Sequence, residues 1–151
     1  MKCDKLGYTL LLALCLLPSL PISENKLLAM TRYLHFLELT ARLHSGKEVE
    51  QWLGHAEEAD YTVIKWLYIA QESPQRYVVC YMESFDEGEK EWHQVADFSL
   101  LDPDEEVRRA FESVKEAVAF AIHTYGASAD RFLPDGMLPV EYATYWHSKQ
   151  H

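Results

Sequence analysis

Three strand-like segments in succession constrain the fold of this chain more than any other feature. Residues 62–70, 77–85 and 92–100 are rich in β-branched and aromatic side chains, which are enriched in strands. Ser73-Pro74-Gln75 separates the first two segments, and a turn at 86–90, whose Gly88 can adopt a positive φ, separates the last two. Because links this short join antiparallel neighbours, the sequence predicts an antiparallel meander.

A long helix is predicted to follow the meander, over about 103–125. Asp102 can cap its free amide groups, Pro103 suits the first helical position, and Glu105 completes a capping box. Apolar residues then recur at helical spacing up to Gly126. Ser113 begins a second capping box, so the helix is either continuous or broken near Glu112. In both versions it packs on one face of the sheet.

The flanking segments carry weaker patterns. Residues 37–44 alternate strictly between apolar and polar, which favours a half-buried strand, although polar residues at three- and four-residue spacing also fit a helix. Short helices are predicted at about 47–53 and 138–147, and residues 130–133 form either a short strand or an irregular stretch. The expected fold class is therefore α+β, with a three- to four-stranded antiparallel meander and a helix on one face.

The chain divides into an apolar leader, residues 1–29, and one acidic domain, residues 30–151. Two lysines precede the uncharged run 6–22, as in a signal peptide. Translation from Met30 is the alternative, because the folded pattern begins just after it. The protein is exported under the first interpretation and cytoplasmic under the second. The apolar run is short and ends in prolines, so no stable membrane span is expected.

Net charge limits the partners. The chain carries 24 acidic and 14 basic side chains, a formal net charge of −10. Such a polyanion repels phosphate backbones and anionic lipid surfaces, so nucleic acid binding is disfavoured, whereas a basic protein is a compatible partner. The acidic segment around the 86–90 turn is a candidate binding site for that partner, although its charges also suit a soluble hairpin tip. Its members are Glu83, Asp86, Glu87, Glu89 and Glu91.

Aromatic residues make up 13% of the chain, and three of them lie together near the C-terminus. Tyr142, Tyr145 and Trp146 are a candidate protein-binding cluster if they are exposed, because Tyr and Trp are enriched at interfaces. The alternative is that they belong to the hydrophobic core.

Sequence motifs offer little support for catalysis. The chain has no phosphate-binding glycine loop, no Cys-x-x-Cys, no His-Glu-x-x-His and no Gly-x-Ser-x-Gly. Cys80 is the single cysteine after Met30, and alternation places it in the core. No cofactor or metal site is expected. Polar groups for an alternative pocket between sheet and helix are His93, Asp97 and His123.

Two functional hypotheses follow. The first is a small acidic, non-catalytic protein-binding domain of the inhibitor or immunity type, which occupies a basic partner by charge complementarity. The second is a small enzyme or small-molecule-binding domain with its pocket between sheet and helix. An exported domain of another role remains open if the leader is real.

Overall fold

The computed structural model describes residues 33–105 and 107–151, which form an α+β fold built on a five-stranded antiparallel sheet. The predicted fold class is confirmed, with one or two strands more than expected. The predicted leader and the start at Met30 lie outside the described residues. The elements in chain order are α3 (Phe36–His44), β1 (Val49–Glu57), β2 (Thr62–Ser73), β3 (Arg76–Phe85), η2 (Val95–Asp97), β4 (Val107–Phe111), α4 (Val114–Tyr125), β5 (Leu133–Pro134) and α5 (Leu138–Lys149).

The centre of the sheet is a meander of three long strands. The strand order is β4-β3-β2-β1-β5, and every neighbouring pair is antiparallel. The predicted strands at 62–70 and 77–85 are β2 and β3, which pair from Val63 opposite Phe85 to Ser73 opposite Arg76. Gln75, in the turn between them, has a φ of 62°, which the short connection imposes on a non-glycine residue.

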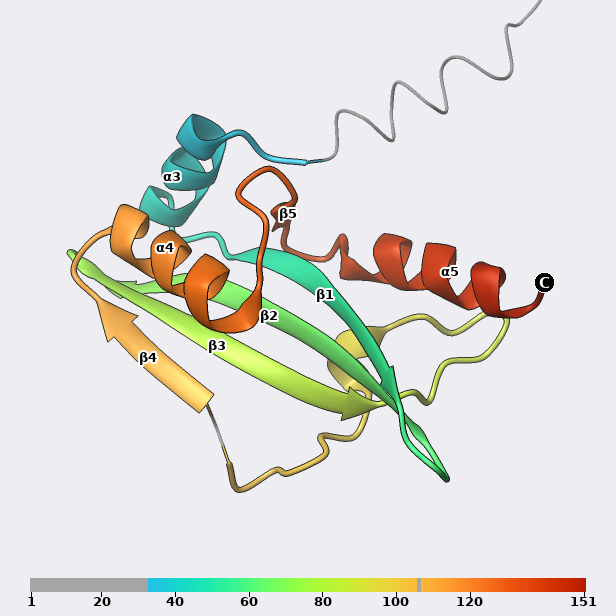
Figure 1. Cartoon of the computed structure of the whole chain (residues 1–151). Coiled ribbons are helices and arrows are strands. Elements are labelled where there is room, and N and C mark those ends of the chain that lie inside the picture. Colours follow the sequence, from blue (N-terminus) through green and yellow to red (C-terminus); the bar gives the residue numbers. More distant parts are fainter. Residues whose placement is uncertain (1–32, 106) are drawn as a thin grey trace, which may run out of the picture. The chain divides into compact units, whose positions relative to one another are not determined.

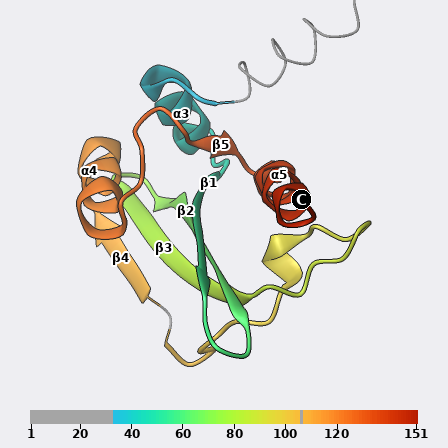
Figure 2. The same ribbon diagram turned by 45° about the vertical axis from the view of Figure 1, so that its right-hand side comes forward.

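Helices cover both faces of this sheet (Figures 1 and 2). Successive side chains of β2 point to opposite faces. Leu67 and Ile69 pack in one buried cluster with α3 and α4. Ile64 and Trp66 pack in a second cluster with α5 and η2. The apolar run of β2 is therefore explained by burial on both sides.

Two predictions in the N-terminal part are wrong. The favoured strand at 37–44 is helix α3, whose first turn is held by Glu38, since its carboxylate accepts the backbone N–H of His35 at 2.9 Å. Leu39 and Leu43, four residues apart, are its buried residues, whereas Leu37 is 81% exposed. The helix alternative therefore holds, because one face of the segment packs on the sheet.

The predicted helix at 47–53 is instead strand β1. Val49 and Gln51 are buried on one face, and Trp52 packs with the cluster on the other face. A bulge between Trp52 and Gly54 then shifts the register against β2. Pairing with β2 overrides the weak helical spacing, because it satisfies the backbone groups of the whole segment.

The long helix predicted over 103–125 is two elements, β4 and α4. The break near Glu112 is present, and the Ser113 side chain caps α4 by accepting the N–H of Glu116 at 3.2 Å. Gly126 ends α4 with a φ of 71°, as a C-terminal glycine should. The Asp102 carboxylate does not start a helix. It accepts the N–H of Asp104 at 3.1 Å within a local turn.

The third predicted strand, 92–100, is also absent from the described structure. That segment contains the single helical turn η2 and meets the sheet at an isolated bridge between Ser84 and Leu100. Val95 and Phe98 are buried against the α5 face of the sheet, which explains the strand-like composition.

The C-terminal prediction is confirmed, since the helix expected at 138–147 is α5. The Glu50 carboxylate on β1 accepts the N–H of Leu138 at 2.6 Å and so caps this helix from outside its own sequence. The segment 130–133 is mostly irregular, which was the other alternative, and β5 begins only at its last residue, Leu133. Among the described residues, no helix is long and apolar enough to span a membrane.

Candidate functional site

The acidic residues of the predicted binding segment differ in their surroundings, because Asp86 forms hydrogen bonds within the fold. Its carboxylate accepts hydrogen bonds from the Tyr142 hydroxyl, from the Tyr145 hydroxyl at 2.9 Å and from the Lys149 ammonium at 2.9 Å. Burial raises the pKa of Asp86, but the bonds from Tyr142, Lys149 and Tyr145 outweigh burial, and the net shift is downward. Asp86 thus ties the end of β3 to α5.

The rest of the 86–94 loop is divided between structural and exposed groups. Glu87 accepts the backbone N–H of Ser99 at 2.9 Å, and this bond lowers its pKa. Glu89 and Glu91 are exposed, and Glu89 pairs with Trp92 through an isolated bridge. The loop is therefore anchored at its first residues and presents its acidic charge further along.

The predicted aromatic cluster belongs mostly to the core. Tyr142 is fully buried, Tyr145 is 8% exposed, and Trp146 is half-buried against the same cluster. Burial raises the pKa of the Tyr142 hydroxyl, and the bond to Asp86 raises it further. The exposed aromatic side chain in this region is Trp92, with 52% of its surface accessible.

The structure does not bring the alternative pocket residues together. The His93 ring packs at 5.5 Å from Tyr142, on the α5 face of the sheet. His123 is an exposed residue of α4, which covers the opposite face. Asp97 is an exposed residue of η2. Within residues 33–105 and 107–151, no three His, Cys, Asp or Glu side chains are grouped to hold a metal ion.

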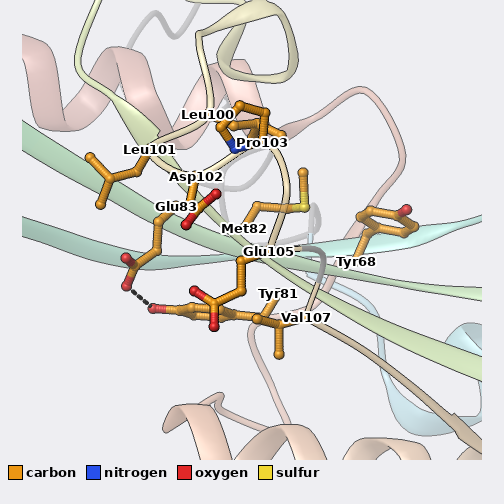
Figure 3. Close-up of a pocket in the computed structure, with 10 residues that line it drawn as sticks. All are labelled: Tyr68, Tyr81, Met82, Glu83, Leu100, Leu101, Asp102, Pro103, Glu105 and Val107. Carbon is orange, nitrogen blue, oxygen red and sulfur yellow. Dashed lines mark hydrogen bonds between the residues drawn. The ribbon is translucent and has the colours of Figure 1, made fainter.

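A cavity at the outer edge of β3, which we call the edge cavity, contains Glu83 and combines carboxylates with tyrosines (Figure 3). Its volume is about 480 Å³, within the range of roughly 300–1,000 Å³ typical of ligand pockets. Its walls come from β2, β3 and the segment that leads into β4. The lining residues are Tyr68, Tyr81, Met82, Glu83, Leu100, Leu101, Asp102, Pro103, Glu105 and Val107.

The edge cavity exists because the strand beside β3 is interrupted. Leu100 lies opposite Ser84, and Leu101 donates its N–H to the Glu83 carbonyl at 2.9 Å. The pairing resumes with Val107 opposite Tyr81, where an uninterrupted antiparallel strand would place residue 103. About four extra residues therefore leave the edge of the sheet.

Carboxylates dominate the charge of the edge cavity (Figure 3). The Tyr81 hydroxyl donates to Glu83 at 2.7 Å, while Asp102 and Glu105 are exposed on the interrupting segment. Burial raises the pKa of Tyr81, and the bond to Glu83 raises it further. Of the ten described lining residues, three are acidic and none is basic. The arrangement is suited to attract a cation.

Basic residues near the edge cavity compensate this charge only in part. Lys65 of β2 approaches Glu83 at 3.6 Å, and both side chains are more than 30% exposed, so the pair is weak. Arg108, on the strand that begins at the cavity, pairs with Glu72.

Two tyrosine side chains of the edge cavity are held in position by neighbouring residues. Tyr81 stacks on Tyr125 of α4 with the ring centroids 4.3 Å apart. Tyr68 lies opposite Cys80 in the sheet, and its pKa is raised first by burial and then by its hydrogen bond with the thiol. Cys80 itself is 1% exposed, as the alternation predicts. Both rings are thus held in place by neighbouring elements, and they lie on opposite faces of the sheet because Tyr81 follows Cys80 in β3.

A second cavity, of about 360 Å³, lies between β1, the segment after α4, and α5. Its acidic residue Glu141 accepts the Tyr33 hydroxyl at 2.6 Å and lies 3.9 Å from Arg131. Its main charges therefore compensate one another, in contrast to those of the edge cavity.

Sequence reasoning found only Glu83 among the residues of the edge cavity that carry charge or a ring. Asp102 and Glu105 were assigned to a helix start, and Tyr68 and Tyr81 to strands without a functional role. The four-residue interruption depends on pairing between segments, so no local pattern reveals it. Comparisons with protein-family models, curated proteins and solved structures find no match to this chain.

Proposed function

We propose that this protein is a small acidic, non-catalytic binding domain that occupies a basic partner protein, as inhibitor and immunity-type proteins do. One observation carries the proposal. The edge cavity places three carboxylates beside the fixed ring of Tyr81, with Tyr68 on the opposite face of the sheet, and its described lining has no basic residue. Acidic and aromatic groups in one concave site suit a positively charged protein surface.

The charge of the whole chain supports the same partner. A net charge of −10 raises the rate at which a basic protein encounters this one, and it opposes binding to nucleic acid. The exposed residues Glu89, Glu91 and Trp92 add acidic and aromatic surface on the 86–94 loop. Side chains of the two buried clusters fill much of the space between sheet and helices, and the main charges of the cavity between β1 and α5 compensate one another.

The test begins with affinity capture of the native protein and identification of the captured partner by mass spectrometry. Association of the two purified proteins is then measured at several salt concentrations. We expect the association rate to fall steeply as salt rises, because exposed charges are screened within about 10 Å at 0.1 M salt. A rate insensitive to salt would contradict the proposal.

Two charge reversals refine this test. Glu105→Lys changes an exposed residue of the edge cavity, and Asp130→Lys makes the same change of charge on an exposed loop near the opposite edge of the sheet. We expect Glu105→Lys to slow association several-fold more than Asp130→Lys. Equal effects would show that the partner responds only to net charge.

A further inference from the structure

We infer that the edge cavity receives an arginine side chain of the basic partner and acts as the anchoring pocket of the interface. This inference rests on the proposed function and adds the chemistry of recognition. The inference rests on the position of the three carboxylates, the fixed ring of Tyr81 and the apolar walls. Each of these matches one part of an arginine side chain.

The carboxylates match the guanidinium group. Glu83 comes from β3, whereas Asp102 and Glu105 come from the segment that interrupts the edge strand. Acceptors that approach from two segments suit a planar group with five N–H donors, which can pair with more than one carboxylate at once. A lysine ammonium is a compact, strongly hydrated point charge and gains less from such an arrangement.

The Tyr81 ring favours arginine over other cations. A guanidinium group stacks on aromatic faces and is attracted by their π-electrons. Tyr81 is fixed by its contact with Tyr125 and by its bond to Glu83. A pre-positioned ring loses little conformational freedom on binding, so its attraction for the incoming group is retained.

The apolar walls match the aliphatic stem of the side chain. Met82, Leu100, Leu101, Pro103 and Val107 line the edge cavity beside the carboxylates. Arginine buries its methylene groups along such surface while its charged end meets the acidic groups. Charge complementarity thus commits the site to a cationic side chain, and the combination of the Tyr81 ring and the apolar walls selects arginine.

The experiment titrates the isotopically labelled full chain with three short acetylated and amidated peptides and follows backbone amide signals by NMR. The peptides are Gly-Arg-Gly, Gly-Lys-Gly and Gly-citrulline-Gly. Citrulline has nearly the shape of arginine without its charge. We expect millimolar binding of the arginine peptide, with shifts at Tyr81, Met82, Glu83 and Leu101, binding at least threefold weaker for lysine, and none for citrulline at the same concentrations.

Matched variants locate the interaction. Asp102→Asn/Glu105→Gln should weaken binding of the arginine peptide at least fivefold, whereas Asp130→Asn should leave it unchanged. A retained amide spectrum shows that each variant is folded. Equal binding of arginine and lysine, or shifts spread equally over Glu57, Glu89 and Asp130, would overturn the assignment. So would an unchanged affinity in the cavity variant or no shifts with the arginine peptide.

Failure of this inference is distinguishable from failure of the proposed function. A salt-sensitive association with the partner, combined with no response to the arginine peptide, would overturn the anchoring pocket alone. Specific arginine binding, combined with a partner association that ignores salt, would overturn the electrostatic binding function alone.

Discussion

Asp86 and the edge cavity show two opposite uses of carboxylates from one acidic part of the chain. The Asp86 side chain is 7% exposed and accepts hydrogen bonds from three donors, so its charge is neutralised within the fold. Glu83, three residues earlier, accepts the Tyr81 hydroxyl and pairs only weakly with Lys65, and it faces a cavity whose described lining adds the exposed carboxylates of Asp102 and Glu105. Acidic residues that look alike in the sequence thus differ in whether their charge is available to a partner.

The physical origin of this difference is the neighbour that each carboxylate meets. Asp86 lies under α5, whose Tyr142, Tyr145 and Lys149 supply donors. Asp102 and Glu105 lie on an exposed segment that has left the edge of the sheet. We therefore expect substitutions at Asp86 to affect stability and substitutions in the edge cavity to affect binding.

The largest effect is expected for Asp86→Ala. The substitution leaves two tyrosine hydroxyls and an ammonium group without their acceptor, and we expect it to lower the free energy of unfolding by about 3 kcal/mol. Urea denaturation measures the change. The matched control is Glu89→Ala in the same loop, which should cost less than about 0.5 kcal/mol because that side chain is exposed. Similar values for both variants would contradict a structural role for Asp86.

Gly88→Ala should have the next largest effect. A Cβ at this position would overlap the Tyr142 hydroxyl and ring, so the glycine is required by lack of space, and it is not among the positive-φ glycines. We expect a loss of about 2 kcal/mol in the free energy of unfolding.

A double-mutant cycle sharpens this prediction. If the Asp86 network holds the loop against Tyr142, Gly88→Ala should cost less when Asp86→Ala has already released the loop. Additive effects would show that the two sites act independently.

The pH dependence of stability should reflect Asp86. The pKa of Asp86 is about 3.9 in the unfolded chain and lower than that in the folded state. Its stabilisation is therefore complete above about pH 4 and is lost as pH falls through the folded pKa. Urea denaturation between pH 2 and 6 should therefore show a decline below about pH 4 that is smaller in Asp86→Asn. A decline of the same size in this variant would assign it to other groups, since the pKa of Glu87 is also lowered.

The smallest effect on stability is expected for Asp102→Asn/Glu105→Gln. Both carboxyl groups are exposed, and the amide of Asn can still accept the N–H that Asp102 accepts from Asp104. Thermal unfolding should place this variant within about 0.5 kcal/mol of the parent. A loss above about 1 kcal/mol would show that these carboxylates hold the segment in place and would weaken the contrast with Asp86.

Sequence patterns specified the elements whose local composition or end signals fit a single secondary structure. The strands at 62–70 and 77–85 were predicted because β-branched and aromatic residues are continuous there, and α5 was predicted from Leu138-Pro139 onwards. Ser113 and Gly126 correctly marked the ends of α4, because a cap satisfies its own helix end through neighbouring residues. Local chemistry thus determined the α+β class, the core position of Cys80 and the acidic character of the domain.

Tertiary structure decided the secondary structure of the segments whose pattern fits both a helix and a strand. It also formed the whole of the candidate site. Residues 37–44 became a helix and residues 49–57 a strand because packing on the sheet and pairing with β2 override weak local preferences. Strand pairing likewise overrides the helix-start signal at Asp102-Pro103, because Val107–Phe111 pairs with β3. Whether an acidic side chain is neutralised or available depends on which distant donors reach it, as Asp86 and the exposed Glu105 show, and spacing along the chain does not encode that proximity.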